Sequence, residues 1–140
     1  PNVMIGGSDA GAHLDRMAGA PYTTAWLADC LRGRQLTSME NAIRHLTDVP
    51  ARLFGFTGRG RIAEGWHADI VVFDPETVGA TDVELVFDLP GGSKRLWSEA
   101  TGISRVLVNG VVSVADGTAT GAIAGKVMRA GVDTETVTAS

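Results

Sequence analysis

The spacing of the apolar residues changes near residue 58, and this change constrains the fold more than any other feature of the chain. Before it, apolar residues recur every three or four positions over residues 22–34 and 39–46, which predicts two helices. After it, short β-branched runs bounded by glycines predict strands. The sequence therefore predicts an α/β segment of residues 1–57 followed by a β segment of residues 58–130.

The helical part contains two recognisable boundary signals. The sequence TSME at residues 37–40 matches a capping box, in which we expect Thr37 to cap the helix and Glu40 to reach back to it. Pro50 is expected to begin a short third helix that ends at Gly55. The polar residues 131–140 are expected to form a disordered tail.

Two strand signals stand out in the second half. Residues 69–74 contain a continuous apolar run, IVVF, between two aspartates, which predicts a strand covered on both faces and central in its sheet. Residues 105–114 predict a hairpin around Asn109 and Gly110, because these residue types tolerate the positive φ angles of a two-residue turn. Arg61 and Ile62 are expected to form a further short strand.

Residues 81–101 contain a basic and aromatic patch, and we expect them to form a long excursion. Lys94 and Arg95 beside Trp97 could clamp a substrate carboxylate, since a cation binds the anion and an aromatic ring shields it. The alternative is a solvated loop without a binding role, and we favour this alternative.

Composition limits the class of protein. The 140 residues are 44% hydrophobic and 20% charged, which is ordinary for a globular domain with a core. The net charge of −4 gives no reason to expect nucleic acid or an anionic membrane as a partner. No apolar run approaches the roughly 20 residues that span a bilayer. A single cysteine, Cys30, excludes an internal disulfide and favours a reducing, cytoplasmic location. Cys30 falls on the apolar face of the helix predicted over residues 22–34, where we expect it to pack as a small hydrophobic residue.

An acidic residue follows the first apolar run of the chain. Residues 3–5 are apolar and lead through glycines to Asp9, an arrangement by which α/β barrels present a catalytic carboxylate at a strand end. The residues alone leave a second interpretation open, in which Asp9 is a solvated turn aspartate. A strand so close to Pro1 also suggests that the chain is the end of a longer protein.

Four motifs together resemble one family. They are GSDAGAH at residues 7–13, LTSMENAIRHLT at 36–47, RGRIAEGWHADIVVFD at 59–74 and VLVNG at 106–110. In this order they are similar to the C-terminal portion of N-acyl-D-amino-acid deacylases, in the amidohydrolase superfamily. The resemblance implies the last strand and helices of a (β/α)8 metal-dependent hydrolase barrel, followed by the C-terminal part of a small β-sandwich. Such a chain would be incomplete on its own.

The resemblance also implies roles for residues of the first motif. Asp9 matches the catalytic aspartate that holds a metal-bound water and takes its proton, and it is a possible metal ligand. His13, Ser8 and Gly11 are implied to lie beside the substrate or behind the residues that contact it. The complete enzyme is implied to use zinc.

The histidines do not complete such a metal site by their spacing. His13, His45 and His67 are scattered, and the chain contains no His-x-His pair. We therefore expect this chain to retain no zinc and to be inactive when isolated.

The implied function is hydrolysis of a carbon–nitrogen amide bond other than a peptide bond, with a small N-acyl amino acid as substrate. Two alternatives remain open. The parent could be an amidohydrolase that acts on a cyclic amide. The chain could instead be a non-catalytic β-rich module that self-associates or binds a partner. In either case the remainder of the parent polypeptide, or another copy of the chain, is expected to cover the sheet edges.

Overall fold

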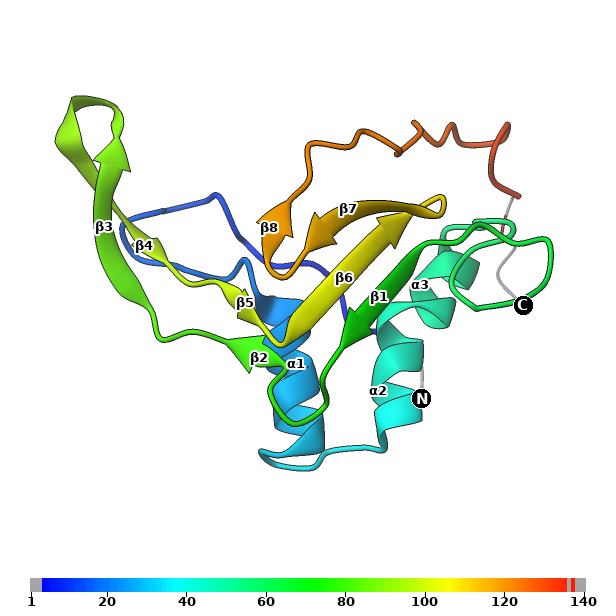
Figure 1. Cartoon of the computed structure of the whole chain (residues 1–140), viewed down its shortest axis with the longest axis horizontal. Helices are drawn as coiled ribbons and strands as arrows, with labels where there is room; N and C mark the ends of the chain where they lie inside the picture. Colours follow the sequence, from blue (N-terminus) through cyan, green and yellow to red (C-terminus); the bar gives the residue numbers. More distant parts are fainter. Residues whose placement is uncertain (1–3, 136, 138–140) are drawn as a thin grey trace.

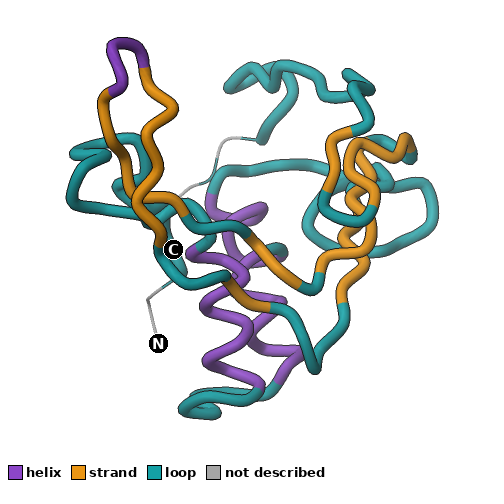
Figure 2. The backbone as a smooth tube through the Cα atoms, turned by 60° about the vertical axis from the view of Figure 1, so that its left-hand side comes forward, coloured by secondary structure: helices purple, strands orange, loops and turns teal. Residues whose placement is uncertain are grey.

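The computed structural model describes residues 4–135 and 137, which form three α-helices and eight strands (Figure 1). The helices are α1 (Tyr22–Leu31), α2 (Met39–Leu46) and α3 (Asp48–Leu53). Figure 2 shows the helices grouped together, with the strands in separate groups around them. None of the helices in the described part is long and apolar enough to cross a membrane.

The strands form three antiparallel sheets. The largest has the order β1-β6-β7-β8, with β1 (Ile70–Phe73), β6 (Ile103–Val108), β7 (Val111–Ala115) and β8 (Thr118–Ala119). A second pair joins β2 (Gly79–Ala80) to β5 (Ala100–Thr101), and a third joins β3 (Glu84–Leu89) to β4 (Ser93–Trp97) through the 3-10 turn η1 (Pro90–Gly92). The β3–β4 hairpin extends away from the rest of the molecule (Figure 1).

The hairpin predicted around Asn109 and Gly110 is confirmed. It joins β6 to β7, with Val108 opposite Val111, and the two turn residues have φ angles of 49° and 80°. The turn forms because asparagine and glycine adopt this left-handed conformation at little cost. Local turn chemistry is thus sufficient to define this part of the sheet.

The prediction for residues 69–74 is correct about the strand but wrong about its place. Among the described strands, β1 lies at an edge and pairs only with β6, and Val71 and Val72 are 52% and 47% exposed. An apolar run favours a strand, but it does not determine how many neighbours the strand acquires. The strand expected at Arg61 and Ile62 is absent from the described structure, where Ile62 is exposed.

The excursion expected over residues 81–101 is an ordered one, whose strands were not predicted. Most of this segment forms the β3–β4 hairpin, in which Leu85 lies opposite Leu96 and Val86 opposite Arg95. Apolar and polar residues do not alternate regularly in these two strands, so the two-residue period of a strand cannot be recognised in their sequence.

The start of α2 lies one residue later than predicted. Ser38, rather than Thr37, has the extended conformation of a capping residue, and its side chain accepts a hydrogen bond from the Asn41 amide at 3.3 Å. The Thr37 hydroxyl instead accepts a hydrogen bond from the Asn41 side chain at 2.7 Å. The backbone amide of Glu40 and the Ser38 side chain hold the pKa of the Glu40 carboxyl below its usual value.

A Ser38→Ala variant is expected to lower the free energy of unfolding by about 1 kcal/mol, because it removes the acceptor for an amide at the start of α2. Urea denaturation of the chain measures this change. Ser93→Ala, at another exposed serine outside the helices, serves as the control and should change the stability much less. Equal losses would show that the Ser38 cap contributes nothing.

The third helix begins before the residue that was expected to start it. α3 spans Asp48–Leu53, so Pro50 occupies its first turn rather than its first position. Proline is tolerated there because the amide it lacks has no partner within the helix. Gly55 follows the helix with a φ of 67°, as the predicted end requires.

One small core joins the helices to the strands. Its buried members are Leu27 and Cys30 of α1, Ala42 of α2, and Val78 just before β2. Phe73 and Ile103, from β1 and β6, pack against this cluster. The predicted apolar position of Cys30 is confirmed, and burial raises the pKa of its thiol. The division at residues 57 and 58 stays a prediction.

Residues 131–135 lie against the loop after α3. Thr134 pairs with Phe56 in an isolated bridge, and the Glu135 amide donates to the Gly55 carbonyl at 2.8 Å. The disorder predicted for residues 131–140 includes residues 136 and 138–140, which lie outside the described residues. That expectation stays a prediction.

Candidate functional site

The segment that carries Asp9 is a loop. Residues 4–9 form no strand in the described structure, which corrects the expected barrel strand; Val3 lies outside the described residues. A strand is stable only when its backbone groups find partners, and no other segment of the described chain pairs with this one. Asp9 is exposed to solvent.

Consecutive turns bring the four predicted site residues into one short loop: Ser8, Asp9, Gly11 and His13. The Ser8 hydroxyl accepts a hydrogen bond from the Ala10 amide at 3.2 Å, and the Asp9 carbonyl accepts one from the Ala12 amide at 3.0 Å. Gly11 has a φ of 95° and His13 a φ of 46°. The loop therefore turns sharply at Gly11, a conformation that glycine adopts without strain.

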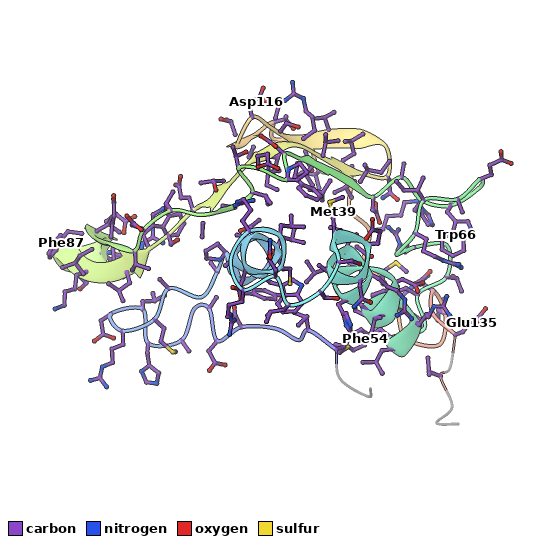
Figure 3. The ribbon with its side chains drawn as sticks, turned by 90° about the horizontal axis from the view of Figure 1, so that it is seen from below. Met39, Phe54, Trp66, Phe87, Asp116 and Glu135 are labelled. Atoms are coloured by element: carbon purple, nitrogen blue, oxygen red, sulfur yellow. The ribbon has the colours of Figure 1, made fainter. Side chains whose placement is uncertain are left out.

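A backbone contact connects this loop to the β3–β4 hairpin. The Leu96 amide on β4 donates to the Leu14 carbonyl at 2.7 Å, so the loop runs beside the basic and aromatic patch. Figure 3, viewed from below, shows the blue loop next to the hairpin that carries Phe87. The structure thus places a segment that we expected to be a solvated excursion close to the candidate site loop.

Within the patch, Arg95 is already engaged. Its Nε donates to Oδ1 of Asp88 at 2.7 Å, and a second guanidinium nitrogen contacts Oδ2 at 2.5 Å. This pairing holds the pKa of the Asp88 carboxyl below its usual value. The guanidinium also lies 4.0 Å over the Trp97 ring. Lys94, by contrast, is exposed, so it is the better placed of the two cations to meet an anion.

The described residues do not by themselves fit a zinc site. No group of three or more histidine, cysteine, aspartate or glutamate side chains is close enough in residues 4–135 and 137 to hold a metal. His45 lies in the last turn of α2, and Nδ1 of His67 contacts Oδ1 of Asn109 at 2.9 Å. Zinc in proteins usually takes three or four such ligands, and Asp9 alone supplies one at most.

Comparison with known proteins decides the family. A family model described as "Amidohydrolase family" matches residues 1–114. The chain belongs to the amidohydrolase family. It is 35% identical over 132 residues to a D-aminoacylase from Alcaligenes xylosoxydans xylosoxydans, a match that covers 90% of this chain and 24% of the relative. It is 37% identical over 96 residues to an N-acyl-D-glutamate deacylase from the same organism, covering 64% of this chain and 18% of the relative.

Solved structures agree with this assignment. A crystal structure of D-aminoacylase superposes with a TM-score of 0.55 and 34% identity, covering 75% of this chain and 20% of that one. A second D-aminoacylase structure, from work on its binuclear metal center, gives the same values. The resemblance to D-aminoacylases is therefore confirmed. The chain spans about a quarter or less of the length of these relatives.

One cluster was missed in the sequence analysis. Arg44, Arg52 and Arg61 surround the carboxylate of Asp48, which is 7% exposed. We call these four residues the arginine cluster. The spacing of four residues from Arg44 to Asp48 and on to Arg52 is a signal for ion pairs on a helical surface. Arg61 joins them through the loop that follows α3, which no spacing rule indicates.

Proposed function

We propose that this chain is the C-terminal portion of a metal-dependent deacylase that hydrolyses N-acyl amino acids, with Asp9 as its general base. The family match over residues 1–114 carries the proposal. Relatives that are D-aminoacylases and N-acyl-D-amino-acid deacylases support the substrate class. Zinc belongs to the proposal for the complete enzyme and would need ligands beyond Asp9.

The chemistry assigned to Asp9 is proton transfer. A water oxygen attacks the acyl carbon of the substrate while the ionised Asp9 carboxylate accepts the proton that the water loses. The carbon–nitrogen bond then breaks, and the proton moves from Asp9 to the departing amine. The exposure of Asp9 and the sharp turn at Gly11 support this role, because substrate can reach the carboxylate.

The sheet edges support the proposal that other polypeptide covers this chain. In the described structure β1 pairs on one side only, and Val72 is exposed on it. Leu85 and Phe87 are exposed on β3. Open strand edges with apolar side chains favour pairing with further strands, either from the remainder of a longer protein or from a second copy. The same observation favours a non-catalytic, self-associating module as the second candidate function.

A substrate panel tests the proposed activity in the full gene product with zinc supplied. We expect hydrolysis of N-acetyl-D-methionine, at least tenfold slower hydrolysis of the L-enantiomer, and none of the cyclic amide dihydrouracil. Release of free amine measures each rate.

Two outcomes would contradict this proposal. Hydrolysis of dihydrouracil in place of every N-acyl amino acid would favour the cyclic-amide alternative. A folded, metal-loaded protein that hydrolyses no substrate of the panel, while the 140-residue chain forms a defined oligomer by light scattering, would favour the binding module.

A further inference from the structure

A cavity of about 520 Å³ lies between the helices and the largest sheet. Figure 3 shows α1 and α2 on one side and the sheet on the other, with the side chains of both layers between them. The wall is mainly apolar and includes Leu27, Ile43, Leu46, Phe73, Ile103 and Val106. Cavities of this size commonly hold small ligands, and none of the lining residues comes from the loop that carries Asp9.

One cationic side chain lines this apolar cavity. Arg61 belongs both to the cavity wall and to the arginine cluster, where its Nε lies 3.4 Å from Oδ1 of Asp48. Its guanidinium carbon lies 4.8 Å from the centre of the Trp66 ring. The ring and the carboxylate hold the Arg61 guanidinium next to the cavity wall, and neither Trp66 nor Asp48 is part of the lining.

The arginine cluster has an excess of positive charge. Arg52 contacts Oδ1 of Asp48 at 2.9 Å, and Arg44 contacts Oδ2 at 3.6 Å, so three guanidinium groups share one carboxylate. The Arg52 hydrogen bond holds the pKa of Asp48 below its usual value, so this carboxylate stays charged. Each arginine contacts Asp48 through Nε, and a guanidinium has further N–H donors that can bind a second anion.

The other charged residue on the cavity wall does not oppose an anion. Asp69 lines the cavity, but its carboxylate forms an ion pair with Arg59. It also accepts a hydrogen bond from the Asn109 amide at 2.8 Å. Its charge is therefore compensated inside the protein, whereas the positive charge at Arg61 is only partly compensated.

We propose that this cavity binds an aliphatic carboxylate, with its chain between the helices and the sheet and its carboxylate on Arg61. A planar guanidinium can bind both oxygens of a carboxylate, which gives the site a preference for this head group. The apolar wall removes the chain from water, so affinity depends on chain length. This ligand site is separate from the proposed deacylase activity, so ligand binding to it can be measured without catalysis.

Calorimetric titration of the full gene product with hexanoate, octanoate and decanoate, below their micelle concentrations, tests the proposal. We expect binding to tighten about fourfold for each added methylene, from the free energy of burying that group. Octyltrimethylammonium, with the same chain and the opposite charge, should not bind. No binding of any carboxylate, affinity independent of chain length, or equal binding of the cation would overturn the proposal.

Three variants test the role of Arg61. Arg61→Gln should weaken octanoate binding about tenfold to a hundredfold, since it removes a charged hydrogen-bonding partner. Arg61→Lys keeps the charge and should retain more affinity than Arg61→Gln. Arg34→Gln is the matched control, because Arg34 is an exposed arginine paired with Asp29 and does not line the cavity. Equal losses in Arg61→Gln and Arg34→Gln would overturn the assignment, with circular dichroism monitoring the fold. A negative result in this binding test would leave the expected result of the substrate panel unchanged.

Discussion

Replacing Asp9 with asparagine in the full gene product is expected to lower kcat about 10²- to 10⁴-fold, the usual contribution of a general base. Asparagine keeps the size of the side chain but cannot accept a proton at neutral pH. The turn contact of Asp9 with the Ala12 amide uses its backbone carbonyl, so the loop should survive the change. Steady-state kinetics with N-acetyl-D-methionine, beside a thermal melt, measure the effect.

The matched control for this variant is Asp15→Asn. Asp15 is another exposed aspartate close to the same loop, and it forms a surface ion pair with Arg16 at 3.7 Å. Exposed pairs of this kind contribute little, so we expect activity within about twofold of the unchanged enzyme. If both substitutions reduced kcat equally, or if Asp9→Asn left it near normal, the assignment of Asp9 as general base would be wrong.

A Gly102→Ala variant is expected to lower the free energy of unfolding by about 3 kcal/mol, among the larger effects of single substitutions. Gly102 has a φ of 72°, where a side chain is strained. An added Cβ would also lie 2.3 Å from the backbone nitrogen of Val78 and 2.5 Å from its Cα. Because Val78 is fully buried, its backbone cannot move away without disturbing the core.

Gly117→Ala separates the two causes of this loss. Gly117 has a similar φ of 78°, but an added Cβ there would meet no atom within 4 Å. It should therefore show only the conformational penalty of about 1–2 kcal/mol. Chemical denaturation of both variants of the chain measures the difference. Equal losses would show that the contact between Gly102 and Val78 does not limit stability.

The sequence predicted the local part of the candidate site but not the distant segments that lie beside it. Ser8, Asp9, Gly11 and His13 are close in sequence, so any turn brings them together. The basic patch near Lys94 is more than 80 residues away, and the folded structure makes the two segments neighbours through the contact between Leu96 and Leu14. Likewise, Arg61 joins the wall of the cavity only because the loop after α3 folds back toward the sheet.

The sequence by itself determined the features that depend on near neighbours. The β6–β7 hairpin follows from the φ angles that Asn109 and Gly110 tolerate, and the burial of Cys30 follows from its place on the apolar face of α1. Ordered motifs were sufficient to predict the amidohydrolase family, which the comparisons confirm.

Only the tertiary structure decided the features that depend on distant partners. β1 is an edge strand because β6 pairs with one of its sides and no described strand pairs with the other. Residues 4–9 form a loop because no described strand lies beside them. The cavity between helices and sheet has the same origin, since its walls come from segments far apart in the chain. Local sequence sets conformational preference, whereas pairing and enclosure are set by which segments meet in space.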